Sequence, residues 1–71
     1  MVWKITLYVY RMSKSVVVDY VIETNDEKIE GQVEFNVDKN SIRLARRDDE
    51  NVLKKIKRFG INLKEIARAY I

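Results

Sequence analysis

Apolar and polar residues alternate along the first two thirds of the chain. Residues 3–9, 16–22 and 29–37 carry a β-branched or aromatic residue at nearly every second position. A period of two places these side chains on one face of an extended strand. The pattern predicts three strands, and Ile42 with Leu44 indicates a shorter fourth strand.

The match between facing residues predicts where the first and third turns lie. Directly opposite residues share one face of a sheet, so apolar residues must face apolar residues. Turns at Ser13 and Lys14 and at Lys39 and Asn40 satisfy this condition. They place Val9 opposite Val18, Leu7 opposite Tyr20, Ile5 opposite Ile22, Val37 opposite Ile42 and Phe35 opposite Leu44.

Charge decides the position of the second turn. With Asn25 and Asp26 at its centre, Glu23 lies opposite Lys28, whereas a shift by one residue would place Glu23 opposite Glu30. Like charges directly opposite each other are unfavourable. The sequence therefore predicts an antiparallel meander of three or four strands, with its second turn at Asn25 and Asp26.

The period changes to that of a helix after residue 47. Apolar residues then recur every three or four positions, at Val52, Ile56, Phe59, Leu63, Ile66 and Tyr70. Asp48, Asp49 and Glu50 stand where this segment begins. Carboxylates at a helix start cap free amides and oppose the positive end of the helix dipole, so we interpret the acidic triplet as a capping signal.

A break near Gly60 divides the helical segment into two helices. Glycine can end a helix in a left-handed conformation. Asn62 and Glu65 have the spacing of a capping box, and Ile61 with Ile66 has that of the accompanying hydrophobic staple. The alternative is one 22-residue helix, because the apolar spacing continues through Gly60 as it would in a heptad seam.

These elements predict a single α+β domain over residues 1–71. Residues 1–47 form the antiparallel sheet, and residues 48–71 form two helices that pack on one of its faces. The covered face is expected to carry Trp3, Ile5, Leu7, Val18, Tyr20, Val33 and Phe35.

Composition excludes several classes of protein and site. The chain has 71 residues and contains neither cysteine nor histidine, so disulfides and the usual zinc sites are ruled out. Strongly apolar runs do not exceed three residues, far below the roughly 20 that cross a bilayer. Without a signal sequence at its N-terminus, the chain is expected to be cytoplasmic and not bound to a membrane.

Catalytic and cofactor signatures are also missing. Acid–base or thiol chemistry would fall to carboxylates, lysines or tyrosines, no serine lies in a Gly-flanked elbow, and the glycines of a phosphate loop are absent. Asp19, Glu23, Glu30 and Glu34 share one sheet face, which we interpret as a solvated surface rather than a metal site. We therefore predict a protein that is not an enzyme and has no cofactor, metal or small-molecule substrate.

Charge divides unequally between the two parts of the chain. Residues 1–38 carry four Lys or Arg against seven Asp or Glu, and residues 39–71 carry ten against four. A basic surface of this kind favours a polyanionic partner, and we predict nucleic acid, with duplex DNA preferred. The predicted phosphate-binding residues are Arg43, Arg46, Arg47, Lys54, Lys57, Arg58, Lys64 and Arg68.

The segment from Val52 to Ile71 has the form helix, Gly-Ile-Asn, helix. It resembles the helix-turn-helix of bacterial and archaeal transcription regulators, in which a glycine opens the turn and a capping residue precedes the second helix. The resemblance covers about 20 of the 71 residues. It implies that the second helix presents Lys64, Glu65 and Arg68 to the major groove of DNA.

The sequence departs from the helix-turn-helix pattern in two ways. Ile56 occupies a position where a small residue is usual. The third helix of the family's core would have to form from residues 41–47, which the alternation predicts to be a strand.

The other face of the predicted sheet suggests protein contacts. Tyr8, Tyr10, Val17 and Val21 share this face, and exposed apolar patches often mark interfaces. The first strand, if it lies at an edge, has no proline and little charge to prevent pairing with another chain. We predict a homodimer formed through this strand or face, and the alternative function is a protein-interaction or regulatory adaptor that self-associates through its sheet.

Overall fold

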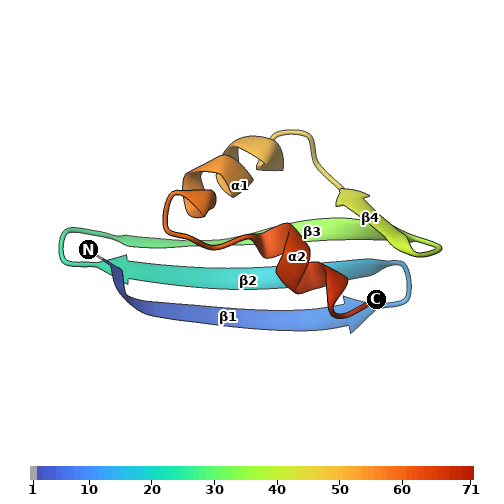
Figure 1. Ribbon diagram of the computed structural model, residues 1–71, viewed down its shortest axis with the longest axis horizontal. Coiled ribbons are helices and arrows are strands. Elements are labelled where there is room, and N and C mark those ends of the chain that lie inside the picture. Colours follow the sequence, from blue (N-terminus) through green and yellow to red (C-terminus); the bar gives the residue numbers. More distant parts are fainter. Residues whose placement is uncertain (1) are drawn as a thin grey trace.

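Four antiparallel strands lie side by side in the order in which they occur along the chain (Figure 1). The computed structural model describes residues 2–71. The strands are β1 (Val2–Met12), β2 (Ser15–Thr24), β3 (Lys28–Asp38) and β4 (Ser41–Leu44). Two helices follow, α1 (Asp49–Lys57) and α2 (Leu63–Arg68). The predicted α+β fold, a meander followed by two helices, is confirmed.

The predicted strand registers are confirmed at all three turns. The β1–β2 ladder pairs Leu7 with Tyr20, and the β2–β3 ladder pairs Glu23 with Lys28. The short β4 strand pairs Ile42 with Val37. Matching apolar positions and avoiding like charges were therefore sufficient to define the sheet.

The turn between β2 and β3 is stabilised by one threonine side chain. Thr24 Oγ1 accepts hydrogen bonds from the amides of Asp26, at 3.2 Å, and Glu27, at 3.0 Å. The Thr24 amide donates to the carbonyl of Glu27 at 2.9 Å. These bonds satisfy the backbone of the turn and hold the second register in place.

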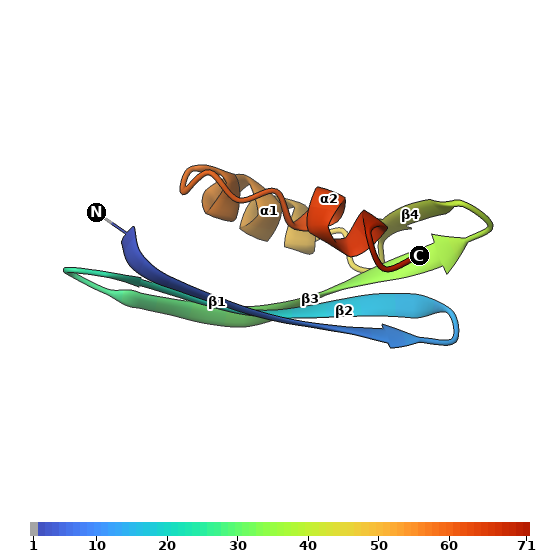
Figure 2. The same cartoon turned by 60° about the horizontal axis from the view of Figure 1, so that its bottom comes forward.

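Both helices cover the same face of the sheet (Figure 2). Helix α2 packs against β2 and β4. The core between the two layers comprises Val16, Val18, Tyr20, Ile22, Val33, Phe35, Ile42, Ile56, Ile61, Leu63 and Ala67. None of the helices within residues 2–71 has the length and apolar character needed to cross a membrane.

The prediction of the covered face is wrong for two residues. Trp3 is 62% exposed and Ile5 is 43% exposed. The β1–β2 register shifts between Val2 and Lys4, so Trp3 is the extra residue of a bulge and leaves the alternation. Ile5 keeps its face, but α2 packs over β2 and β4, which leaves this part of the edge strand uncovered.

The helical segment breaks where the sequence predicted. Helix α1 ends at Lys57, Gly60 adopts a left-handed φ of 81°, and α2 begins at Leu63. The single 22-residue helix is therefore not formed. The break turns α2 back onto the sheet, which buries Leu63 and Ala67.

The expected hydrogen-bonded cap at the start of α1 is absent. Asp48 is the N-cap residue, but its side chain makes no capping hydrogen bond. The amides of Asp49, Glu50 and Asn51 donate instead to the carbonyls of Arg46, Arg47 and Asp48. Because the backbone already satisfies these amides, the carboxylates Asp49 and Glu50 contribute through the helix dipole alone.

Candidate nucleic-acid interface

The sheet separates carboxylates from the helical layer. Val18, Tyr20 and Ile22 of β2 belong to the core beneath the helices. Asp19 and Glu23 alternate with them and therefore face the opposite side. Glu30 and Glu34 of β3 lie opposite Val21 and Val17, which places them on this same open face. The acidic side chains of β2 and β3 thus lie away from α1 and α2.

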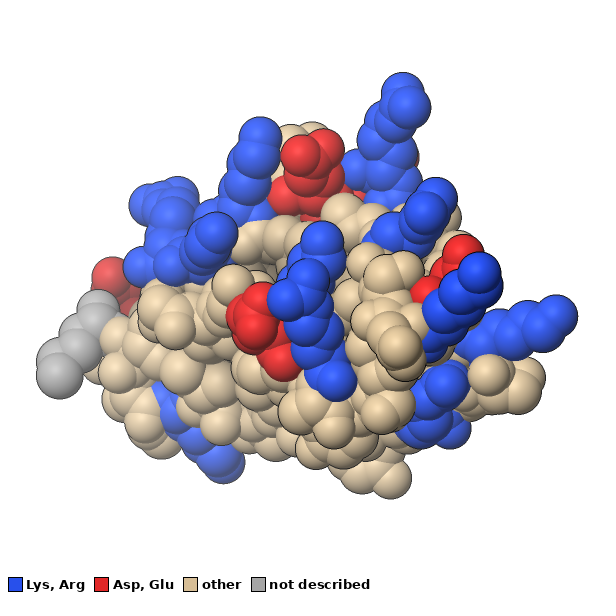
Figure 3. All heavy atoms as spheres, turned by 45° about the vertical axis from the view of Figure 1, so that its right-hand side comes forward, with Lys and Arg blue, Asp and Glu red and all other residues tan. Residues whose placement is uncertain are grey.

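Cations dominate the opposite side, which we call the helical layer and define as residues 45–71. This segment carries eight Lys or Arg and four Asp or Glu. Figure 3 shows the long Lys and Arg side chains projecting into solvent, separated by small groups of carboxylates. The chain therefore presents one side with a positive excess and one with a negative excess.

Three of the predicted phosphate-binding lysines surround one pocket. Lys54 and Lys57 of α1 and Lys64 of α2 line a pocket of about 220 Å³, which we call the lysine pocket. Its other lining residues are Glu50, Leu53, Ile61, Asn62 and Leu63. The pocket is therefore lined by three apolar residues, three lysines, one glutamate and one asparagine.

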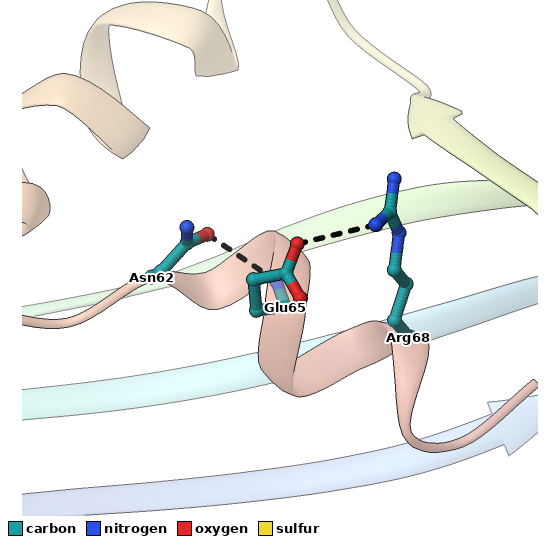
Figure 4. Close-up of polar contacts among 3 residues, drawn as sticks. All are labelled: Asn62, Glu65 and Arg68. Atoms are coloured by element: carbon teal, nitrogen blue, oxygen red, sulfur yellow. Dashed lines mark hydrogen bonds and ion pairs between the residues drawn. The ribbon is translucent and has the colours of Figure 1, made fainter.

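The capping of α2 fixes the pocket wall that carries Lys64. The Asn62 side chain accepts a hydrogen bond from the Glu65 amide at 3.2 Å (Figure 4). The predicted capping box is only half formed, because the Glu65 carboxylate accepts from Arg68 at 3.3 Å instead of reaching back to Asn62. Gly60 supplies the left-handed turn that brings this cap back toward α1.

The three lysines of the pocket take part in no salt bridge within residues 2–71. Within residues 2–71 the only salt bridge joins Arg68 to Glu65, at 3.3 Å, and both side chains are more than half exposed. Exposed pairs of this kind stabilise a fold by at most about 1 kcal/mol, so Arg68 can exchange its partner for a phosphate at little cost. Lys54, Lys57 and Lys64 have no carboxylate within salt-bridge distance in the described chain.

The remaining predicted phosphate contacts are more dispersed. Arg46 and Arg47 are exposed in the connection between β4 and α1, and Arg58 is exposed at the C-cap of α1. Arg43 lies opposite Asn36 in the β3–β4 ladder, on the open face rather than on the helical layer. The structure thus brings Lys54, Lys57 and Lys64 together and places Arg43 apart from them.

One buried tyrosine is electrostatically coupled to the start of α1. Burial raises the pKa of the Tyr20 hydroxyl above its ordinary value, and the nearby Asp49 carboxylate raises it further. Both effects favour the neutral phenol, because an anion here would lose hydration and meet a like charge. Tyr20 is therefore part of the core rather than of the charged surface.

The two helices do not form a helix-turn-helix domain. Residues 41–44 are strand β4, so the third helix of that family's core is missing from the described chain. Helix α2 has six residues and packs on β2 and β4. The implied presentation of Lys64, Glu65 and Arg68 in a major groove therefore lacks the supporting domain.

The predicted protein-contact residues differ in exposure. Tyr8 is 67% exposed, Tyr10 and Val21 are half-buried, and Val17 is only 4% exposed. The Tyr10 hydroxyl accepts a hydrogen bond from Gln32 Nε2 at 3.1 Å. Val17 is covered by its own chain and offers almost no surface to a partner, so Tyr8 is the main accessible residue of this group.

The sequence predicted the lysines of this site as phosphate contacts, but it did not predict the pocket that they line. Leu53 and Ile61 supply its apolar lining, and Glu50 lies beside the lysines. The spacing of Lys54 and Lys57 placed them on one helix surface, but Lys64 joins them only through the reversal of the chain after Gly60. Among residues 2–71, no group of three or more carboxylates is arranged to hold a metal ion.

Comparisons with known proteins do not assign the chain to a family. No family model matches the sequence, no curated protein is significantly similar to it, and no solved structure matches its fold at a significant level.

Proposed function

We propose that this protein is a non-enzymatic nucleic-acid-binding module that contacts the phosphates of duplex DNA through its helical layer. The observation that supports it is the lysine pocket: three lysines line one site on the side of the sheet away from the acidic face, and none of them forms a salt bridge within residues 2–71. Phosphate contacts by lysine are largely independent of base sequence, so the proposal is for sequence-tolerant binding in the cytoplasm.

Arg46, Arg47, Arg58 and Arg68 extend the proposed contact beyond the pocket. All four are exposed and belong to the helical layer. Arg43 lies on the open face and is a peripheral contact at most. The carboxylates of that face would repel a phosphate backbone, which gives the module one preferred side for binding.

Salt dependence tests the proposal with a charge-matched control. In one variant Lys54, Lys57 and Lys64 are replaced by Gln, and in the control Lys14, Lys28 and Lys39, which lie outside both β1 and the helical layer, are replaced by Gln. All six lysines are exposed, and each triple lowers the net charge of +3 by the same amount. Only the location of the lost charge differs between the two proteins.

Binding to a fluorescent DNA duplex is measured by anisotropy over a range of salt concentrations. We expect the pocket triple to reduce the slope of log K against log salt by about 2.7, because each lost phosphate contact removes about 0.9. The control triple should retain most of the slope. Equal losses in both proteins, or no binding by the unsubstituted protein at low salt, would refute the proposal.

A protein-interaction adaptor is the second candidate, and the exposure of Tyr8 on a sheet face favours it. In that case the positive excess on one side of the sheet and the negative excess on the other would serve contacts between protein chains. The DNA titration separates the two candidates, because an adaptor would show no preference between the pocket and control triples.

A further inference from the structure

The longest edge of the sheet is open. Strand β1 pairs only with β2 and has 11 residues, whereas the other edge strand, β4, has four. An unpaired edge exposes a row of backbone donors and acceptors, and natural proteins protect such edges with prolines, charges or short strands. Strand β1 has no proline, and its only charged residues are Lys4 and Arg11.

We propose that β1 pairs antiparallel with β1 of a second copy, about a twofold axis that passes through Leu7. Leu7 is the central residue of the strand, so this register pairs the regular segment from Lys4 to Tyr10 with itself. It places Leu7 opposite Leu7 and Ile5 opposite Val9 of the second copy, on the side that bears the helices. Ile5, which the helices leave exposed, would gain an apolar neighbour.

The same register matches the polar positions of β1. Lys4 lies opposite Tyr10 of the second copy, and Thr6 lies opposite Tyr8. Arg11 would face the Trp3 region of the second copy at the end of the ladder, but its guanidinium donates to the backbone carbonyls of Met12 and, at 3.3 Å, Ser15. Lys4 therefore meets an aromatic side chain, and the strand carries no carboxylate, so no charged residue faces a like charge. This self-complementarity argues for a second copy rather than another protein.

Twofold pairing would also orient the basic surfaces. An antiparallel pair within one sheet is related by an axis perpendicular to the sheet, so both copies keep their helices on the same side. The result is a continuous eight-stranded sheet with two helical layers on one side and the carboxylates on the other. This consequence rests on the proposed function, because it would give duplex DNA two lysine pockets on one surface.

Single cysteines test the register, since the chain has none of its own. Leu7→Cys should form a disulfide-linked dimer on oxidation, because the two Cα atoms would lie about 5 Å apart. Ile5→Cys alone should not, because the two copies of that residue would be separated by about 13 Å along the strands. A mixture of Ile5→Cys and Val9→Cys should cross-link. Equal cross-linking of Leu7→Cys and Ile5→Cys would overturn the register.

Sedimentation without nucleic acid tests the dimer with exposed residues. Thr6 and Tyr8 are both exposed, so their substitution should preserve the fold, which circular dichroism verifies. The variants Thr6→Lys/Tyr8→Lys and Thr6→Glu/Tyr8→Glu each place like charges opposite one another twice. We expect the dissociation constant of each to rise at least about tenfold and an equimolar mixture to dimerise again.

The outcomes separate this inference from the proposed function. A strictly monomeric unsubstituted protein at high micromolar concentration would refute the dimer, even if it binds DNA. A dimer that responds to the charge exchange as expected would support the inference, even if DNA binding fails.

Discussion

The phenol ring of Tyr20 lies across Gly31 on the neighbouring strand. The two residues are directly opposite in the β2–β3 ladder, and a Cβ on Gly31 would lie 2.5 Å from Tyr20 Oη and 2.8 Å from Cζ. In the described chain Gly60 is the only glycine with a positive φ, so Gly31 is needed for space and not for its backbone conformation. A glycine within a strand often marks such a close approach.

Replacing Gly31 should therefore destabilise the fold through Tyr20. We expect Gly31→Ala to lower the free energy of unfolding by about 1 to 3 kcal/mol, because the buried ring must move away from the new methyl group. Chemical denaturation of the two proteins measures the difference.

A double-mutant cycle separates this contact from general effects on the strand. In a Tyr20→Val background the ring is gone, and Gly31→Ala should cost little or even stabilise, since alanine restricts the unfolded chain more than glycine does. If Gly31→Ala lowers the free energy of unfolding equally in both backgrounds, the Tyr20 ring is not responsible for the loss.

The raised pKa of Tyr20 predicts a loss of stability at high pH. The folded protein holds the Tyr20 proton more tightly than the unfolded chain does, so the resulting stability is complete below the unfolded pKa of about 10 and declines above it. Burial is the main cause, and Asp49 adds to it. Between about pH 9 and 11, Tyr20→Phe should lose less unfolding free energy than the unsubstituted protein, as measured by urea denaturation at each pH. If the unfolding free energies of the two proteins fall in parallel over this pH range, Tyr20 is not the source of the pH dependence.

Gly60 is required for its conformation rather than for space. Its φ is 81°, and a Cβ at this position would meet nothing within 4 Å. Gly60→Ala should therefore cost about 1 to 2 kcal/mol through backbone strain alone, measured by thermal or chemical unfolding. Gly60→Asn should cost less, because asparagine tolerates the left-handed region better. Equal costs for the two substitutions would point to another cause.

The sheet could be predicted from the sequence because its constraints are local and redundant. Alternation defined each strand, and a single choice between Lys28 and Glu30 as the partner of Glu23 fixed the second register. The helix break was visible because Gly60 and Asn62 each carry a conformational preference that is independent of packing.

The errors arose where an outcome depended on three-dimensional packing. Trp3 fits the period of two, but a bulge removes it from the core face, and the alternation contains no signal for that extra residue. The exposure of Ile5 reflects how far the helices reach over the sheet. The lysine pocket depends on the path of the chain between Lys57 and Lys64, which periodicity does not specify.

The cap at Asn62 links stability to the proposed binding surface. Its side chain accepts the Glu65 amide and so fixes the first turn of α2, which carries Lys64 into the lysine pocket. Asn62→Ala should lower the free energy of unfolding by about 1 kcal/mol, and Asn62→Ser should retain most of it, because serine can accept the same bond. Lys64→Gln should change stability by less than about 0.5 kcal/mol, since the side chain is exposed and unpaired in the described chain. Denaturation of the three variants measures these differences. If Asn62→Ala unfolds at the same denaturant concentration as the unsubstituted protein, the cap does not hold α2 in place, and Lys64 must be positioned by the burial of Leu63 and Ala67 alone.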